Sequence, residues 1–499
     1  MSPEGRIARG AVVLLSAQPI TWVASLAIAV FLPHFLGDRA LGQYALASTI
    51  ALLAAIMTSF GVIRYVTREV AASDAAAARL VPAAIVLLTG LGMIAAVVLS
   101  IVLPIAGLLA SAAHLIPIAL VGMVVSKPAH LLSGVLHGQE RFDRLATFGA
   151  VGGVGTAVLG LGALALGGDV GAYIAAFAGV SAATGLILWR MSGFELGRAA
   201  LDTSLWGQLL RGGMPFLGWS IALRLYAEID KILLAFLSTE ATIGWYAASY
   251  RIVSIPLCIP TLLVMPLLPV LARTASDMPV FQRTLRRSVL GALLFTVPTS
   301  ALLLALAPAV PGVLHWPSEF QHAIPLMTIL ALQGPLVAVD MVLGTALVAL
   351  GRERRWALVA VVAAVFNPVV NLGLIPAFER STQNGAIGAA IVTVLTEVVM
   401  LCGALRLLPA SMLGRDTVVT SVKIAVAGAP TALAAFALLP ASLSLAVLGG
   451  CIAFIAATAA LGIYRSDDVR AIGGVANELV SQHLPWLASR LPAPTRYTR

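Results

Sequence analysis

The sequence predicts an all-α integral membrane protein with about fourteen transmembrane helices, arranged as two six-helix bundles and two additional C-terminal helices. Three observations support this fold class. The 499 residues are 60% hydrophobic and only 11% charged, whereas a soluble domain carries roughly 25% charged residues. Apolar runs recur along the whole chain, and one short segment occurs twice. This composition excludes a soluble protein, and no basic soluble face for nucleic acid is present.

The apolar runs define the predicted elements, because a helix needs roughly 20 apolar residues to cross a bilayer. The first run is too long for the apolar part of a signal peptide, about 7–15 residues, so we interpret it as an uncleaved helix. We predict four regions: an N-terminal bundle (1–200), a C-terminal bundle (201–410), two additional helices (411–464) and a cytoplasmic tail (465–499). The predicted spans are 11–33, 43–66, 81–103, 115–136, 145–166, 170–189, 214–237, 243–270, 288–311, 322–350, 356–376, 385–408, 417–439 and 442–463.

A duplicated segment relates the two predicted bundles. Residues 35–49 are F-L-G-D-R-A-L-G-Q-Y-A-L-A-S-T, and residues 236–250, F-L-S-T-E-A-T-I-G-W-Y-A-A-S-Y, repeat the pattern after a one-residue gap. A second, shorter repeat, which we call the second echo, consists of G-Q-E-R at 138–141 and G-R-E-R at 351–354. An even number of helices separates the repeats, so both halves have the same orientation. This predicts a pseudo-twofold axis along the membrane normal and a cavity between the halves, as in transporters.

The basic residues predict the orientation in the membrane. With the N-terminus in the cytoplasm, only Arg39 and Arg380 of the 31 lysines and arginines lie outside. Five more lie within the apolar runs, and the remaining 24 face the cytoplasm. The reverse orientation would violate the positive-inside rule. We therefore expect a multi-pass protein with both termini in the cytoplasm, and we interpret the net charge of +9 mainly as a topology signal.

Several short segments occur in a characteristic order over the first twelve predicted helices. They are Leu36-Gly37, Leu41-Gly42-Gln43-Tyr44-Ala45, Arg64-Tyr65-Val66-Thr67-Arg68-Glu69-Val70-Ala71, Gly138-Gln139-Glu140-Arg141-Phe142, Ile229-Asp230-Lys231, residues 244–251, residues 367–376 and residues 385–397. Taken together, these segments resemble the oligosaccharide flippase (Wzx-type) branch of the MOP superfamily. The resemblance implies translocation of a polyprenyl-diphosphate-linked oligosaccharide to the outer leaflet of the bacterial cytoplasmic (inner) membrane by alternating access. It implies membrane lipids and polysaccharide polymerase or export machinery as further partners.

Ionisable residues inside the predicted spans are the candidate functional groups. Each costs about 2.5–3.5 kcal/mol at mid-depth and therefore faces a partner or a wet cavity. Guanidinium and ammonium groups could hold the anionic diphosphate by charge-assisted hydrogen bonds. Arg64 could instead extend to the membrane interface. We predict that the substrate diphosphate is bound by Arg224, Lys231, Lys127, Arg251 and Arg64.

Three acidic residues, Glu228, Asp230 and Asp340, are candidates for charge pairing and gating. Asp230 and Arg251 lie at similar depth in adjacent antiparallel helices, so a buried pair is expected, either in the cavity or only holding the helices together. The spacing of the second echo relates Lys127 to Asp340, so one half has a cation where the other has an anion. These two could pair in one conformation and separate in another, or line the cavity independently.

A second set of polar residues is a candidate for ion coupling. Asp340, Glu397, Asn367, Asn371 and His130 could form a proton or cation site, with H⁺, Na⁺ or the membrane potential driving transport. The simpler interpretation is interhelical hydrogen bonding for the amides and hydrogen-bonded packing for His130. We predict no metal site and no other cofactor.

No catalytic motif is found. A P-loop, an HExxH sequence and a GxSxG nucleophile elbow are all missing, so we predict a transporter rather than an enzyme. Cys258, Cys402 and Cys451 lie in apolar runs and form no disulfide or metal pattern. Two alternatives remain: a multidrug or small-solute antiporter of the same fold, with an acid-lined cavity, and a membrane glycan polymerase or ligase, with a large outer loop.

Overall fold

The structure, a computed structural model, describes residues 3–106, 112–264, 267–409 and 411–463. These segments are almost entirely helical, and no strand occurs among them. The all-α fold class is thereby confirmed. The predicted cytoplasmic tail at 465–499 lies outside the described residues.

The first part of the chain folds into a bundle in which α4 packs against α3, α2 and α7, and α1 packs against α5. The elements are α1 (Pro3–Ser59), α2 (Val62–Ala72), α3 (Asp74–Ile105), α4 (Leu115–Gly138), α5 (Phe142–Gly155), the π-helical turn η2 (Thr156–Gly160), α6 (Leu161–Ala165), α7 (Val170–Ser192) and the 3₁₀ turn η3 (Arg198–Leu201).

The second part forms another bundle, in which α15 packs against α12 and α17, and α16 packs against α17. Its elements are α8 (Thr203–Leu237), α9 (Glu240–Ser254), η4 (Ile255–Leu257), α10 (Cys258–Val264), α11 (Leu267–Thr274), α12 (Met278–Leu306), η5 (Ala307–Ala309), α13 (Val310–Val313), η6 (Ser318–Ala323), α14 (Ile324–Ala331), α15 (Gln333–Ala349), α16 (Glu353–Thr382) and α17 (Ala386–Leu407). The last two helices are α18 (Gly414–Leu438) and α19 (Leu443–Ala460).

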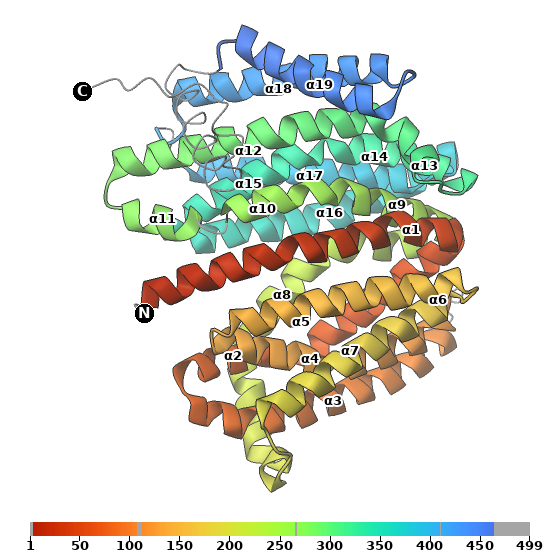
Figure 1. Ribbon diagram of the computed structural model, residues 1–499, viewed down its shortest axis with the longest axis vertical. Coiled ribbons are helices and arrows are strands. Elements are labelled where there is room, and N and C mark those ends of the chain that lie inside the picture. Colours follow the sequence, from red (N-terminus) through yellow and green to blue (C-terminus); the bar gives the residue numbers. More distant parts are fainter. Residues whose placement is uncertain (1–2, 107–111, 265–266, 410, 464–499) are drawn as a thin grey trace, which may run out of the picture.

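Figure 1 shows these bundles stacked along the long axis of the molecule, with α2–α7 below and α9–α17 above. The long helix α8 connects them, since it contacts α2 and α3 of one bundle and α9, α16 and α17 of the other. The pair α18–α19 packs on α12 at the upper end. This arrangement leaves α1, α8 and α9 at the junction of the bundles, where the predicted cavity should lie.

Eleven helical segments of the described residues are long and apolar enough to cross a membrane. The first, Gln18–Ser59, overlaps the first two predicted spans, because two helices meet directly at the non-helical Gly37 (φ 71°, ψ 179°) with no loop between them. Glycine adopts such a positive φ readily because it has no Cβ. The predicted spans 214–237 and 243–270 fall in α8 and α9–α11, which are helical but not among the eleven.

Proline divides the span predicted at 243–270. Helix α9 ends at Ser254, Pro256 lies in the 3₁₀ turn η4, and α10 begins at Cys258. Proline lacks the backbone N–H and clashes with the preceding turn, so it bends or breaks a helix.

Each bundle has its own apolar core, and many large apolar side chains point outward. Leu88 and Leu131 lie in the core beneath α2–α4, and Leu343 in the core between α12, α15 and α18. On the outside, Val97 of α3 and Val365 of α16 are more than half exposed. Exposed apolar side chains in this number suit contact with lipid and would be a liability in water.

Candidate functional site

The two copies of the duplicated segment cross each other where α1 meets α9. Gly42 and Gly244 occupy matching positions in the copies, and both are buried. A Cβ atom on Gly42 would overlap the carbonyl oxygen of Glu240, and a Cβ on Gly244 would overlap that of Asp38. Only glycine permits this close approach of the two backbones.

Side chains join the copies reciprocally at the same place. The indole Nε1 of Trp245 donates to Asp38 Oδ2 at 3.0 Å. The amide Nε2 of Gln43 donates to Glu240 Oε2 at 2.6 Å. Asp38 and Gln43 correspond in the repeat to Glu240 and Trp245, so each copy supplies one acceptor and one donor. We call this contact between residues 38–43 and 240–245 the crossing.

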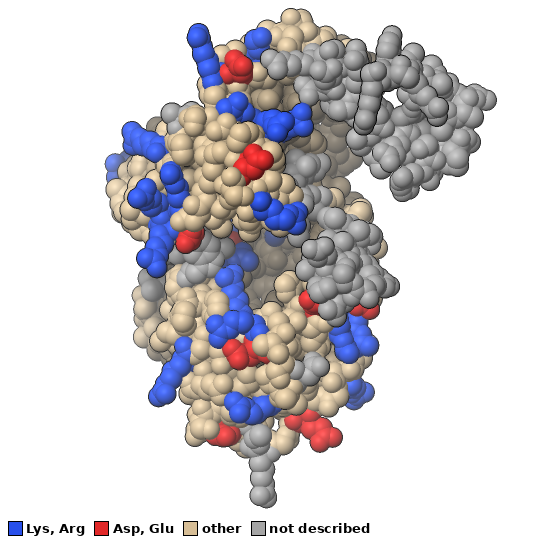
Figure 2. Space-filling model, turned by 90° about the vertical axis from the view of Figure 1, so that its left-hand side faces the viewer, with Lys and Arg blue, Asp and Glu red and all other residues tan. Residues whose placement is uncertain are grey.

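The chain is tied together at the same end by a further contact. Trp316, in the connection before η6, is buried, and its Nε1 donates to the carbonyl oxygen of Val30 at 2.8 Å. Figure 2 views the opposite end, where lysines and arginines gather and a hollow separates the two bundles. The bundles are therefore joined at the crossing and separated toward the basic face.

A cavity of about 150 Å³ lies immediately inside the crossing, between α1, α8 and α9. We call it the junction cavity. The polar residues that line the junction cavity are Tyr44, Ser48, Thr49, Glu228, Lys231, Tyr250 and Arg251. Among them, Lys231 Nζ forms an ion pair with Glu228 Oε2 at 2.7 Å, and Thr49 Oγ1 donates to the same oxygen at 3.2 Å.

Arg251 is the second cation of the junction cavity and has no acidic partner among the described residues. Its guanidinium carbon lies 5.5 Å from the ring centroid of Tyr44, a cation–π contact. Its NH1 nitrogen is buried and makes no hydrogen bond to the described residues. With Lys231, Arg251 and only one carboxylate, the cavity carries an excess of one positive charge.

Asp230 lies on another face of α8 and is surrounded by neutral donors. Its carboxylate accepts hydrogen bonds from the hydroxyl groups of Tyr246 (2.8 Å) and Thr393 (3.0 Å) and from Asn371 Nδ2 (2.8 Å). Asn371 Nδ2 also donates to Asn367 Oδ1 at 2.9 Å. Asp230, Asn367, Asn371 and Thr393 are all buried, and together with Tyr246 they form what we call the Asp230 cluster.

The ion pair predicted between Asp230 and Arg251 is not formed. Successive helical residues are rotated by about 100°, so positions 246 and 251 of α9 lie about 140° apart. Helix α9 directs Tyr246 at Asp230, and Arg251 consequently faces Tyr44 and the junction cavity. The predicted face of α8 carrying Glu228 and Lys231 does line this cavity.

Lys127 is bound within the N-terminal bundle. Its Nζ donates to Ala55 O (2.8 Å), Thr58 Oγ1 (2.7 Å) and Ser59 Oγ (3.3 Å), all on α1. It does not pair with Asp340 in this structure, and the two residues are separate here. Lys127 does not line the junction cavity.

The remaining predicted residues divide into buried and exposed groups. Asp340 of α15 is buried and interacts directly with Glu397 of α17. No amide, amine or alcohol group of the described residues hydrogen-bonds its carboxylate. Arg64, Arg224 and His130 are exposed, and none of them lines the junction cavity.

Sequence reasoning missed the residues that complete these sites. Tyr44 and Tyr246 occupy matching positions in the two copies of the duplicated segment, and so do Asp38 and Glu240. Their recurrence was visible in the sequence, but their contacts depend on which helix faces which. A search for polar residues repeated in both copies would have selected them.

The comparisons with known proteins agree with this architecture. A model of the family described as polysaccharide biosynthesis protein matches residues 7–275, more than half of the chain. The probable low-salt glycan biosynthesis flippase Agl15 of Haloferax volcanii is 24% identical over 173 residues, which are 34% of this chain and 35% of that protein. The match thus spans about a third of this curated relative.

Solved structures of MOP-superfamily transporters share the fold. The lipid II flippase MurJ in an inward closed conformation aligns with a TM-score of 0.74 at 12% identity, covering 90% of this chain and 98% of MurJ. An inward-facing multidrug resistance transporter of the MATE family aligns with a TM-score of 0.57 at 17% identity, covering 79% and 94%. The chain has the MOP-superfamily fold and belongs to the polysaccharide biosynthesis protein family.

Proposed function

We propose that this protein is a flippase that moves a polyprenyl-diphosphate-linked oligosaccharide from the cytoplasmic to the outer leaflet. The observation that carries the proposal is the junction cavity, which places Lys231 and Arg251 against a single Glu228 inside a membrane-spanning bundle. Family membership and the similarity to proteins named as glycan biosynthesis and lipid II flippases support the same substrate class.

The charge of the junction cavity suits an anionic diphosphate. Arg251 NH1 is a buried donor without a partner, and an unsatisfied buried donor costs about 1–3 kcal/mol or more when charged. A phosphate oxygen would satisfy it by a charge-assisted hydrogen bond. At about 150 Å³ the cavity has room for a small anionic group, so the sugar and the lipid chain would extend beyond it.

An apolar groove between α12, α15, α17 and α18 suits the lipid chain. Its volume is about 760 Å³, and its walls are almost entirely aliphatic, including Leu293, Val339, Leu405 and Val422. A polyprenyl chain has only apolar surface to bury, which favours such a groove. We assign this groove to the polyprenyl part of the substrate.

The positions of the crossing and the basic face support a proposal of alternating access. By the positive-inside rule the basic face is cytoplasmic, so the crossing closes the outer end. Capture from the cytoplasmic leaflet would be followed by separation of the crossing and release outside. The Asp230 cluster is the proposed coupling site, because Asn371 Oδ1 is a buried acceptor with no donor beside the carboxylate, and an H⁺ or Na⁺ would suit these oxygens.

A deletion strain complemented with variants tests the proposal. Loss of the protein should leave lipid-linked glycan on the inner leaflet and remove surface polysaccharide. Lys231→Ala and Arg251→Ala should fail to complement, whereas Lys231→Arg should complement because it keeps the charge. Arg224→Ala, on the same helix but outside the cavity, is the matched control and should lose less activity.

Two outcomes would overturn the proposal. Normal surface glycan in a deletion strain without a redundant flippase would exclude this substrate. Drug resistance on overexpression, with unchanged surface glycan, would instead indicate an antiporter.

A further inference from the structure

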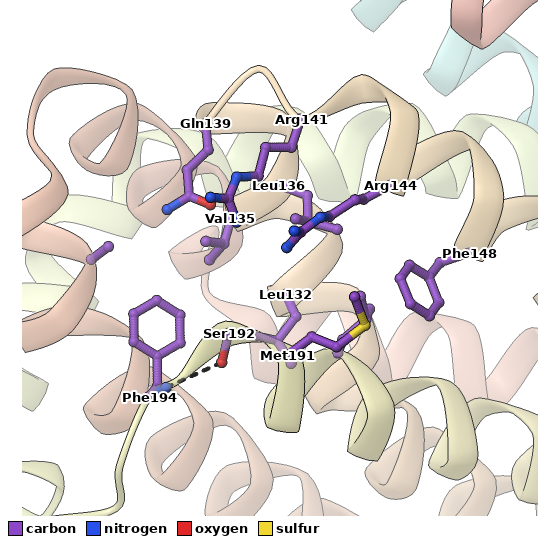
Figure 3. Close-up of a pocket in the computed structure, with 12 residues that line it drawn as sticks. Leu132, Val135, Leu136, Gln139, Arg141, Arg144, Phe148, Met191, Ser192 and Phe194 are labelled. Carbon is purple, nitrogen blue, oxygen red and sulfur yellow. Dashed lines mark hydrogen bonds between the residues drawn. The ribbon is translucent and has the colours of Figure 1, made fainter.

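A second basic pocket lies within the N-terminal bundle, at the ends of α4, α5 and α7. It encloses about 260 Å³. Figure 3 shows Arg141 and Arg144 on one side, Ser192 on the opposite side, and the rings of Phe148 and Phe194 at the two ends. We call it the α5 pocket, and none of its lining residues lines the junction cavity.

The two guanidinium groups of the α5 pocket have no partner among the described residues. Neither Arg141 nor Arg144 forms an ion pair or a side-chain hydrogen bond there. Other arginines near helix ends are occupied differently: Arg286 donates to the carbonyl oxygens of Met412 and Ser411, and Arg352 donates to that of Leu407. Arg141 and Arg144 are therefore available to an external anion.

The second echo shows how the two bundles differ at this place. Gln139 corresponds to Arg352 in the second echo of the sequence, at the start of α16. There Arg352 reaches across to the end of α17 and holds the two helix ends together. In the N-terminal bundle the equivalent position is a glutamine that lines the α5 pocket. One copy closes this place with its own arginine, and the other leaves a pocket with two free guanidinium groups beside it.

The lining of the α5 pocket combines cationic groups with an apolar wall. Arg141 immediately precedes α5 and Arg144 lies in its first turn, and both line the same pocket, where the guanidinium fork matches phosphate oxygens. The amide of Gln139 adds a neutral donor, whereas the Ser192 hydroxyl already donates to the carbonyl oxygen of Trp189. The rest of the wall is apolar, including Leu132, Leu136 and Phe148. The matching ligand is a phosphate ester with an apolar part attached.

We propose that the α5 pocket binds the phosphate of an anionic phospholipid from the leaflet on the basic side of the protein. Basic pockets between transmembrane helices on the cytoplasmic side are suited to acidic lipid headgroups. The rings of Phe148 and Phe194 would contact the glycerol and the first methylene groups. A free phosphate ester shares the headgroup chemistry but leaves these apolar walls uncovered. The site is independent of the proposed transport cavity.

Lipid retention by the purified full-length protein tests this site directly. Native mass spectrometry would compare phosphatidylglycerol with phosphatidylcholine, which has no net charge. The wild-type protein should retain phosphatidylglycerol preferentially. The R141Q/R144Q variant should bind the most tightly retained phosphatidylglycerol at least about tenfold more weakly, since two charge-assisted contacts are lost.

The chain offers a matched control in the second echo. Arg354 and Arg355 are exposed at the start of α16 and line no described pocket. R354Q/R355Q removes the same charge and should retain the lipid as the wild type does. The Lys231→Ala variant should also retain it, which separates this site from the transport proposal.

Three results would overturn the inference. Unchanged phosphatidylglycerol retention in R141Q/R144Q would place the lipid elsewhere. Equal loss in R354Q/R355Q would show only a general charge effect. Full displacement by glycerol 3-phosphate, which has the phosphate but no acyl chain, would identify a soluble phosphate ester as the ligand.

Discussion

The two bundles are alike where they meet and opposite where they bury charge. At the crossing, each copy of the duplicated segment supplies one glycine, one acid and one donor to the other. Deeper inside, the N-terminal bundle holds the Lys127 ammonium group, and the C-terminal bundle holds the Asp230 carboxylate. The shared part is a contact between helices, and the part that differs is the chemistry that an ionic substrate would meet.

The buried charges share one feature despite their opposite sign. Lys127 is bound by neutral oxygens and Asp230 by neutral donors, so neither depends on an ion pair. A buried charge without such groups would cost several kcal/mol. Because hydrogen bonds to neutral groups satisfy both charges, neither requires an opposite charge from the other bundle.

The largest expected effect comes from filling the crossing. Gly42→Ala and Gly244→Ala each place a methyl group on a backbone carbonyl of the partner segment. Overpacking of this kind costs about 1–3 kcal/mol, which shifts a two-state equilibrium roughly five- to 150-fold. Both variants should lose surface-glycan complementation to the same extent, since the positions are equivalent.

Two glycines without close neighbours provide the control for this prediction. Gly90 of α3 and Gly373 of α16 have no atom within 4 Å of an added Cβ. Gly90→Ala and Gly373→Ala should complement normally. If only one of the two crossing variants were inactive, the contact would be asymmetric in function despite its symmetric geometry.

A second pair of substitutions should distinguish the two buried charges by their effect on stability. Asp230→Leu removes the shared acceptor of Tyr246, Thr393 and Asn371, although Tyr246 keeps Thr393 Oγ1 and Asn371 Nδ2 keeps Asn367 Oδ1 as acceptors, so it should cost about 1–2 kcal/mol of unfolding free energy. Lys127→Met leaves Thr58 and Ser59 still donating to the carbonyl oxygens of Ala54 and Ala55, so stability should change by less than about 1 kcal/mol. Thermal melting in detergent measures both.

The matched variant for this comparison is Asp230→Asn, which keeps an acceptor in the same place. Its melting temperature should lie between those of the wild type and Asp230→Leu. Equal losses in Lys127→Met and Asp230→Leu would show that the charge itself, rather than the hydrogen bonds around it, decides the stability.

The sequence predicted the scaffold better than the site. Composition and run length were sufficient for an all-α membrane protein, and the duplicated segment selected residues that form the crossing. The prediction failed at Asp230 and Arg251, because similar depth in adjacent helices says nothing about helix rotation. The rotation of α9 is set by packing along its whole length, including Tyr246 against Asp230 and Thr393. The depth of a residue in the membrane can be estimated from one sequence, whereas the direction in which its side chain faces depends on how the neighbouring helices pack.

The mildest substitutions at the crossing remove one hydrogen bond each. Trp245→Phe and Gln43→Leu each remove one hydrogen bond to a carboxylate and replace the donor by an apolar side chain. Each should weaken the closed crossing by no more than about 3 kcal/mol. Spin labels on Arg39→Cys and Glu319→Cys, with the three native cysteines replaced by serine, would report a broader distance distribution in both variants.

The size of these two shifts decides whether the crossing acts symmetrically. The pairs are related by the repeat, so equal broadening is expected, and the double variant measures the coupling between the two bonds because they join the same pair of segments. Broadening in Trp245→Phe alone would assign the closure to the indole–Asp38 contact. Closure of the crossing would then depend on the donor from the second copy of the duplicated segment. The two copies would be symmetric in backbone geometry but not in function.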